Sequence, residues 1–183
     1  MFVMQGDALA ELSDLLNSLL EISEFESGEV ELNIAEIPIQ EVFRQLQDEF
    51  EHQAQAKDLQ LEFNSQSEAA SSDSVLLTRI LRVLVSNAIR YTNKGEVKVF
   101  CSREFGGLRL TVEDSGIGMA SDQLAVIFDE FYRIDNDQVA RNNGLGLGLS
   151  IVERSANLLE TTVDVKSEPG RGSSFSLLVP AAA

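Results

Sequence analysis

Asp-Ser-Gly-Ile-Gly at residues 114–118 directly follows a run, residues 108–113, in which apolar and polar side chains alternate. This alternation predicts a half-buried strand, so we expect Asp114 where a strand ends in a turn. A carboxylate there can accept hydrogen bonds from an exocyclic amine, and Gly116 and Gly118 let a flat base approach the backbone. This pairing favours adenine over guanine. A tight turn closed by a backbone N–H on the Asp carboxylate explains the pattern about as well.

A helix is predicted before this strand. Apolar residues recur at helical spacing over residues 75–91, after Asp73 or Ser74 as a candidate cap. Asn87 lies in this apolar stretch. An asparagine carbonyl is a suitable ligand for Mg²⁺, which takes several other ligands from water and phosphate. A capped or solvent-facing amide is the alternative interpretation.

Several basic residues and Tyr91 could complete a site for phosphate. Arg90 follows Asn87 by less than one turn, and Lys94 comes shortly after the predicted helix. Arg133 and Arg141 lie further along the chain. Such charges supply the local positive potential that an acidic domain needs beside a triphosphate, although charges of this kind are usually solvated surface.

A second glycine-rich stretch, residues 144–148, reads Gly-Leu-Gly-Leu-Gly and precedes a helix predicted over residues 149–159. Glycines at a helix N-terminus expose backbone N–H groups to an anion, and the helix dipole favours the negative charge. A flexible hinge is the alternative. Three alternate glycines weaken both helix and strand, so we prefer a ligand-binding role. The spacing fits neither a Walker loop nor the dinucleotide-binding fingerprint.

The remaining pattern predicts an α+β fold, a two-layer sandwich with a mixed sheet and helices on one face, preceded by an N-terminal helix. A wide apolar stripe marks that N-terminal helix at residues 9–25. A hairpin is expected around residues 106–107, and polar loops at 66–74 and 135–143. Further helices are predicted at residues 39–57 and 123–128, and strands at 30–34, 59–63, 96–103, 162–167 and 173–179.

Composition excludes several functions. The 183 residues carry a formal net charge of −16, which argues against nucleic-acid binding through phosphate contacts. One cysteine, Cys101, cannot form an internal disulfide, and one histidine, His52, leaves no histidine-based zinc cluster. No apolar run approaches the length of a membrane span. We therefore expect a cytoplasmic segment without membrane contact.

Five segments, in this order, resemble the motifs of the ATP-binding catalytic domain of sensor histidine kinases. This is the Bergerat-fold (GHKL) group, which also holds the gyrase B subunit, the MutL repair proteins and heat-shock ATPases. The resemblance covers roughly residues 29–180, and residues 9–32 resemble the second helix of the family's dimerisation and phosphoacceptor hairpin. In chain order, the matching segments are an asparagine box at residues 83–92, a first glycine box at 114–119, a phenylalanine box at 128–133, a second glycine box at 144–148, and a closing glycine and Ser/Thr element at 170–175.

The resemblance implies a site for ATP and Mg²⁺. Asp114 would bind the adenine amine, Asn87 would hold Mg²⁺ and Arg90 would face phosphate, which makes Asn87 and Arg90 the candidate catalytic residues. Residues 135–143 would form a lid anchored by Phe128 and Phe131. The other candidate contacts are Tyr91, Arg133, Arg141, Gly116, Gly118, Gly144, Leu145, Gly146, Leu147, Gly148 and Ser173.

The chain departs from the family pattern in its acceptor. The family's phosphorylated histidine lies on the first hairpin helix, and nothing before Leu9 can form that helix. His52 belongs to the predicted helix 39–57, and we interpret it as a surface residue. We divide the chain into residues 1–28, a partial dimerisation helix, and residues 29–183, the ATP-binding domain. Alone, it should bind nucleotide without phosphorylating itself.

Val83 is the second departure. Four residues before the magnesium asparagine, histidine kinases commonly carry another Asn, and hydrolytic relatives carry a Glu that activates water. Valine can do neither. The missing base argues against gyrase-type hydrolysis and leaves the strength of magnesium binding open.

The leading hypothesis is the catalytic domain of a protein-histidine kinase, with a response regulator as partner and a homodimer formed through the N-terminal helix. A nucleotide-sensing pseudokinase without phosphoryl transfer is the alternative. A serine kinase of the anti-sigma type is disfavoured, because those domains lack the lead-in helix at residues 9–25. The signal sensed, the cognate regulator and any membrane anchor of a full-length protein stay open.

Overall fold

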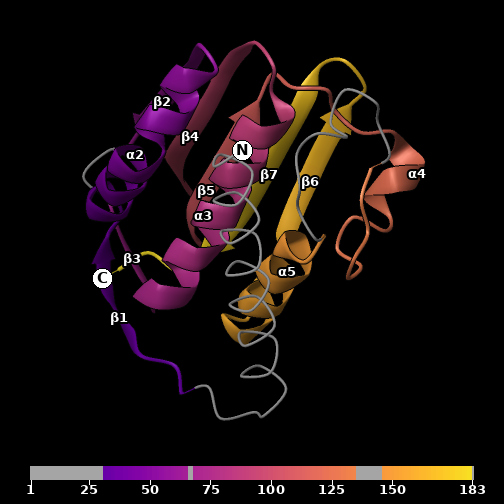
Figure 1. Cartoon of the computed structure of the whole chain (residues 1–183). Coiled ribbons are helices and arrows are strands. Elements are labelled where there is room, and N and C mark those ends of the chain that lie inside the picture. The colour runs from indigo at the N-terminus through magenta and orange to yellow at the C-terminus, as the bar shows by residue number, and fades with distance from the viewer. Residues whose placement is uncertain (1–30, 66–67, 135–145, 183) are drawn as a thin grey trace, which may run out of the picture.

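The computed structural model describes residues 31–65, 68–134 and 146–182. The described chain forms a mixed five-stranded sheet covered by helices on one face, which confirms the predicted α+β sandwich (Figure 1). In chain order the elements are β1 (Ile34–Pro38), α2 (Ile39–Ala56), β2 (Leu59–Asn64), β3 (Ala69–Asp73), α3 (Ser74–Tyr91), β4 (Gly95–Glu104), β5 (Gly107–Asp114), α4 (Ser121–Leu124), α5 (Gly148–Leu158), β6 (Val163–Glu168) and β7 (Gly172–Val179).

The strand order of the large sheet is β2-β4-β5-β7-β6. Among the strands of the described chain, β2 and β4 are the one parallel pair, and α3 forms part of the connection between them. The β4–β5 hairpin pairs Glu104 with Gly107 across a turn made by Phe105 and Gly106, as the glycine pair predicted. β5 is the central strand of this sheet, and the chain that follows it continues toward α4 (Figure 1).

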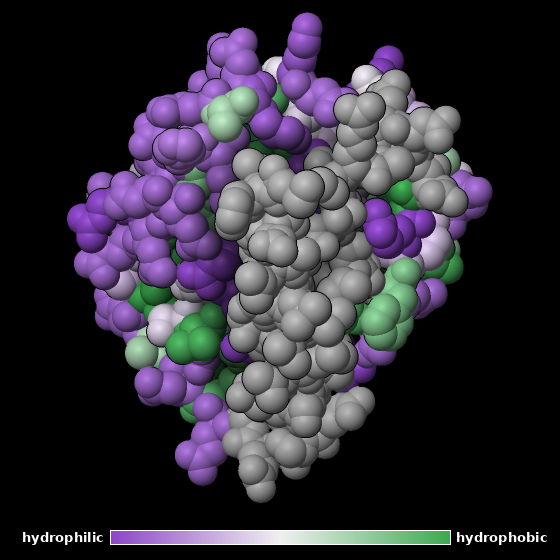
Figure 2. Space-filling view, in the orientation of Figure 1, coloured by the Kyte–Doolittle hydropathy of each residue, from purple (hydrophilic) through white to green (hydrophobic). Residues whose placement is uncertain are grey.

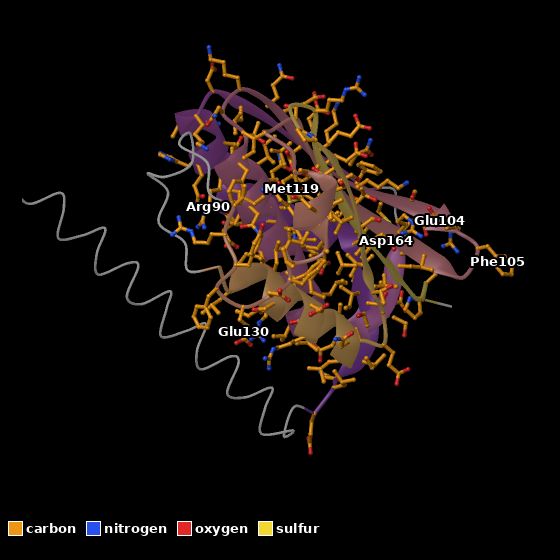
Figure 3. All side chains as sticks on the ribbon, turned by 90° about the vertical axis from the view of Figure 1, so that its right-hand side faces the viewer. Arg90, Glu104, Phe105, Met119, Glu130 and Asp164 are labelled. Atoms are coloured by element: carbon orange, nitrogen blue, oxygen red, sulfur yellow. The ribbon has the colours of Figure 1, made fainter. Side chains whose placement is uncertain are left out.

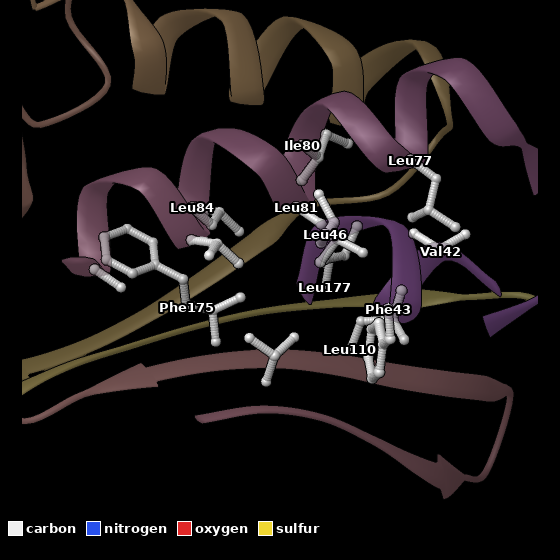
Figure 4. Close-up of a cluster of buried hydrophobic side chains, with 14 of the residues drawn as sticks. Val42, Phe43, Leu46, Leu77, Ile80, Leu81, Leu84, Leu110, Phe175 and Leu177 are labelled. Atoms are coloured by element: carbon white, nitrogen blue, oxygen red, sulfur yellow. The ribbon is translucent and has the colours of Figure 1, made fainter. Parts of the chain in front are cut away.

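One continuous core joins the helices to the sheet (Figure 4). The inward side chains of β5 and β7 alternate with outward ones, as Leu110 and Leu177 illustrate, and both are fully buried. Helix α2 buries a single stripe, whereas α3 is apolar over much of its circumference because it lies between the sheet and α5. Burial of α3 on these sides fixes its position in the domain.

Asp73 is the N-cap of α3. Its Oδ1 accepts hydrogen bonds from the backbone N–H groups of Val75 at 2.9 Å and Leu76 at 3.0 Å. This confirms one of the two predicted caps. Such a cap satisfies donors that a helix N-terminus leaves without partners.

Three local predictions were wrong. The loop expected at residues 66–74 contains β3, which pairs antiparallel with β1. The strand expected at residues 30–34 starts only at Ile34, where this pairing begins. The short helix expected at 123–128 lies earlier, at α4. In each case pairing or packing with distant residues decided the boundary.

The described surface seen in Figure 2 is mostly hydrophilic, with hydrophobic residues in small separate patches. No helix among the described residues is long and apolar enough to cross a membrane. The predicted helix at residues 9–25, and with it the proposed division at residue 28, lies outside the described residues.

Candidate functional site

Helix α3 carries the first group of candidate residues. Val83, Asn87 and Tyr91 recur every four residues and therefore share one side of the helix. Asn87, Arg90 and Tyr91 are all half-buried. No hydrogen bond to the Asn87 side chain is found within the described ranges, so its amide can serve a ligand.

The turn after β5 lies against the end of α3. The backbone N–H of Ile117 donates to the carbonyl oxygen of Tyr91 at 3.2 Å. The backbone N–H of Gly116 donates to Asp114 Oδ1 at 2.8 Å. The second bond is the local Asx turn that the sequence allowed as an alternative. The fold thus brings Asp114 beside the helix that carries Asn87.

Burial sets the electrostatics of Asp114. Desolvation raises the pKa of its carboxyl to about 6, against the lowering effect of hydrogen bonds from the backbone N–H groups of Gly116 and Ser173. A carboxylate shielded from water binds a ligand N–H group strongly, because water does not compete for it. The raised pKa makes Asp114 a candidate functional residue.

Close backbone contacts explain the two glycines of the turn. A Cβ on Gly116 would lie 2.4 Å from the carbonyl oxygen of Tyr91, and a Cβ on Gly118 would lie 1.9 Å from that of Glu168. Gly118 also has a φ of +64°. Side chains at either position would push the turn away from α3 or from the β6–β7 hairpin.

Ser173 lies directly across the sheet from Asp114 in the register of β5 and β7. Its Oγ is 3.0 Å from Oγ of Ser167, which also accepts a hydrogen bond from the backbone N–H of Met119 at 2.8 Å. These contacts tie the end of the Asp114 turn to β6 and β7. Ser173 therefore lies beside Asp114, and its role in binding stays a prediction.

The second glycine box meets α3 at Val83. Helix α5 begins at Gly148, where an added Cβ would lie 3.0 Å from Val83 Cγ1. The N-terminus of α5 is thus one turn of α3 away from Asn87, and Leu147 beside it is buried. Of the other predicted residues in this stretch, Gly146 is half-buried with a φ of +74°, whereas Gly144 and Leu145 lie outside the described residues.

Residues on the two sides of the predicted lid are joined to each other. The backbone N–H of Phe131 donates to the carbonyl oxygen of Gly146 at 3.0 Å, and Arg154 of α5 forms an ion pair with Glu130. Phe128 packs against the core, but Phe131 is 61% exposed, so only one of the two expected anchors is packed. The lid itself, with Arg141, lies outside the described residues.

Other candidates differ in location. Arg133 is exposed. In Figure 3, Arg90 and Glu130 lie on one side of the domain, and the hairpin tip with the fully exposed Phe105 lies on the other. His52 is exposed on α2, as predicted, and Cys101 is buried in β4. Neither belongs to this site.

Sequence reasoning missed two residues of the site. Thr92 is fully buried, its Oγ1 lacks a hydrogen-bond partner among the described residues, and it lies 2.9 Å from the point where a Gly116 Cβ would stand. Lys57 donates to three carbonyls at the end of α3. Thr92 follows Tyr91 in the asparagine box, which was a usable signal. A lysine ending a predicted surface helix offers none.

Comparison with known proteins places this geometry in a family. A family model described as "Histidine kinase-, DNA gyrase B-, and HSP90-like ATPase" matches residues 72–183. The sensor histidine kinase MtrB of Mycolicibacterium paratuberculosis is 32% identical over 94% of this chain and 31% of its own length. Sensor protein SrrB of Staphylococcus aureus is 30% identical over 95% of this chain and 30% of its own length. The chain thus spans about a third of the curated relatives it matches.

Solved structures agree in fold. Full-length ShkA in complex with AMPPNP superimposes with a TM-score of 0.83 at 29% identity, covering 94% of this chain and 36% of that one. The nucleotide-free catalytic domain of histidine kinase ThkA gives a TM-score of 0.69 at 23% identity, covering 81% of this chain and 95% of that one. The second match extends over almost all of an isolated catalytic domain.

Proposed function

Because this chain belongs to the histidine kinase-, DNA gyrase B- and HSP90-like ATPase family, we propose that it binds ATP and supplies the γ-phosphoryl group to a histidine of a sensor kinase. One curated relative is named a sensor histidine kinase and another a sensor protein, and the family model that matches residues 72–183 of this chain is described as an ATPase. The bound AMPPNP of ShkA, an ATP analogue, supports the choice of nucleotide.

The observation that carries the proposal is the half-buried carboxyl of Asp114, with its raised pKa, at the junction of β5, α3 and β7. The exocyclic amine of adenine donates to this carboxylate. Gly116 and Gly118 let the turn pack closely against α3 and the β6–β7 hairpin, which holds this carboxylate in position. Guanine carries a carbonyl oxygen at the equivalent position, and the two acceptors would repel each other.

The phosphates extend from the base toward Asn87, Arg90 and the N-terminus of α5. The α5 N-terminus offers backbone N–H groups and the positive end of an 11-residue helix. Arg90 supplies a fixed positive charge on the same stretch of α3. Together they offset a triphosphate in a chain whose formal net charge is −16.

The residues present fit a magnesium ion that is held mainly by the nucleotide. The described residues contain no cluster of three or more His, Cys, Asp or Glu side chains that could hold a metal alone. Asn87 provides one neutral oxygen, which suits Mg²⁺ coordinated otherwise by phosphate and water. When bound, Mg²⁺ would neutralise charge on the phosphates. Val83, one turn earlier, offers no oxygen to it.

The chain's own residues orient the nucleotide and leave the nucleophile to the acceptor. Val83 lies on the side of α3 that bears Asn87, packed near Gly148, and its two methyl groups cannot activate water. Phosphoryl transfer needs mainly in-line positioning and charge neutralisation. This arrangement favours donation to an incoming histidine over hydrolysis.

Residues 1–28 would belong to the dimerisation hairpin and residues 29–183 to the catalytic domain. The apolar stripe at residues 9–25 supports a homodimer, and the relatives' role as sensor kinases supports a response regulator as the next phosphate acceptor. The magnesium ion, the homodimer and the response regulator are all part of this proposal. The relative MtrB, on which the regulator rests, is covered by this chain over 31% of its length.

The proposal is tested by calorimetric titration with ATP and GTP, with and without Mg²⁺, followed by labelled ATP transfer to a histidine-bearing hairpin supplied in trans. We expect ATP to bind and GTP to bind at least about tenfold more weakly. Asp114→Ala should abolish ATP binding while far-ultraviolet circular dichroism stays unchanged. Equal affinity of the wild-type chain for ATP and GTP would contradict the adenine assignment. Tight ATP binding without transfer to any acceptor hairpin would indicate a nucleotide sensor instead.

A further inference from the structure

Lys57 makes a concentrated set of contacts with the end of α3. Its Nζ donates to the backbone carbonyl oxygens of Ile89 at 2.7 Å, Arg90 at 3.0 Å and Thr92 at 3.1 Å. An ammonium group has three N–H donors, so all of them are used. The side chain reaches from the end of α2 to a helix more than 30 residues away in sequence.

These acceptors are groups that a helix leaves without partners. The last four carbonyls of an α-helix have no intrahelical donor, and the dipole makes this end negative. The backbone N–H of Lys57 donates to the carbonyl oxygen of Ala54 at 3.1 Å, which anchors the base of the side chain to α2. Lys57 is half-buried, and desolvation together with the nearby Arg90 lowers the pKa of its ammonium. The three carbonyls replace the water that burial removes.

The clamped turn of α3 is also the surface on which the Asp114 turn rests. The carbonyl oxygen of Tyr91 lies between the two carbonyls of Arg90 and Thr92 in sequence, and it accepts the hydrogen bond from Ile117 N–H. The backbone at Gly116 packs against the same oxygen. A shift of this last turn therefore moves the support of the turn that begins at Asp114.

We propose that Lys57 is a positioning residue of the nucleotide site, which fixes the last turn of α3 and, through the Tyr91 carbonyl, the turn that follows Asp114. The inference rests on the proposed function, because it assigns Lys57 to the adenine end of that site. Lys57 contacts carbonyls of the protein and is not itself a ligand of the nucleotide.

Two measurements distinguish a positioning role of Lys57 from a role in which it only stabilises α3. A residue that only stabilised α3 would change global unfolding and leave the affinity of the folded protein for ATP unaltered. A positioning residue changes that affinity and loosens the Ile117 hydrogen bond while the centre of the sheet stays protected. Local opening of this kind is measured by amide hydrogen exchange.

Lys57→Met keeps much of the side-chain length and removes the donors, and Lys57→Arg keeps a charged donor. Lys166→Met is a matched control, because Lys166 is exposed on β6. Calorimetry at a temperature where all variants are folded should show ATP binding at least about fivefold weaker for Lys57→Met, restored to within about twofold by Lys57→Arg and unchanged for Lys166→Met. The Ile117 amide should exchange at least about fivefold faster in Lys57→Met, while that of Leu110 in β5 keeps its wild-type protection.

Wild-type affinity for ATP in folded Lys57→Met, or unchanged Ile117 exchange, would overturn the positioning role. If Lys57→Met does not fold, Lys57→Gln, which retains a neutral donor, is compared with Lys57→Arg by the same two measurements. Failure of the proposed function has a different signature, since the wild-type chain would then bind no ATP. The Ile117 exchange of the nucleotide-free variants would still decide whether Lys57 holds the turn.

Discussion

The backbone N–H of Gly116 donates a 2.8 Å hydrogen bond to Oδ1 of Asp114, two residues earlier, so the turn closes on the carboxylate that we assign to adenine. A carboxylate has about four acceptor positions on its two oxygens, and the bonds from Gly116 and Ser173 leave positions for a ligand. The local turn and the ligand contact are therefore compatible. The turn fixes the orientation of the carboxylate before nucleotide arrives, which reduces the entropy lost on binding.

Replacement of Asp114 by Asn should separate stability from binding. Burial raises the pKa of the carboxyl from 3.8 to about 6, so the folded chain holds this proton more tightly than the unfolded chain. Ionisation of Asp114 therefore lowers the free energy of unfolding as the pH rises from about 4 to 6, and this loss is nearly complete at pH 7. Asp114→Asn should raise the free energy of unfolding at pH 7 by about 1–2 kcal/mol in urea titrations.

The same variant should bind ATP at least about tenfold more weakly, because a neutral amide oxygen is a poorer acceptor than a carboxylate. Near pH 3.5 the stability difference between the two proteins should disappear. A variant less stable than the wild-type chain at pH 7 would show that ionised Asp114 supports the fold.

The affinity of the wild-type chain for ATP should depend on the same ionisation. Below pH 6 the carboxyl takes up a proton, and the ionised form that accepts the adenine amine becomes the minority. We expect the dissociation constant to increase toward a limit of about tenfold per pH unit below the pKa. Calorimetry between pH 5 and 8 measures this, with Asp114→Asn as the variant whose affinity should stay level. A flat wild-type profile would remove Asp114 from the binding equilibrium.

Gly172 and Gly170 allow a matched comparison of how tightly the start of β7 packs against Asp114. Both have positive φ, but a Cβ on Gly172 would lie 1.8 Å from the Asp114 carbonyl oxygen, whereas one on Gly170 meets nothing within 4 Å. Gly170→Ala should cost about 1 kcal/mol from backbone conformation alone, and Gly172→Ala at least about 2–3 kcal/mol. Urea denaturation compares them directly. Equal losses would mean that β7 can move away from Asp114 without cost.

Val83→Asn tests the magnesium assignment. An amide at this position lies one turn before Asn87 on the same side of α3, near the start of α5, and adds an oxygen to the proposed site. The affinity for ATP in Mg²⁺ should increase by about threefold or more relative to the affinity in EDTA, at a stability cost of about 1 kcal/mol for the half-buried amide. Asn87→Ala, the opposing control, should reduce the magnesium dependence. If the magnesium dependence of ATP affinity changes in neither variant, the ion binds elsewhere.

Cys101 should be unreactive in the native chain. Burial in β4, with a smaller contribution from Glu68, raises the pKa of its thiol to about 11, so little thiolate exists at pH 8. A disulfide reagent should label it only after unfolding in guanidinium chloride. Rapid labelling of the native protein would indicate that β4 opens locally at Cys101.

The sequence by itself determined the elements whose signal is local. The helices at α2 and α3 were predicted to within a residue or two because their apolar periodicity is repeated over 18 residues each. The turn at Asp114 and the start of α5 were also predicted, since glycines mark backbone that must come close to something else. The sequence did not show which segments approach these glycines, and the fold places Tyr91 against Gly116 and Val83 against Gly148.

Only the tertiary structure decided the features that depend on residues distant in sequence. The serine-rich stretch at β3 carries no strand signal of its own and becomes a strand by pairing with β1. Lys57 ends a surface helix in the sequence, and only folding brings three carbonyls of α3 to its ammonium. The pKa of Asp114 follows from its burial. Periodicity records which side of an element is apolar, whereas pairing, helix clamping and desolvation depend on which other segment packs there, and that is a property of the whole fold.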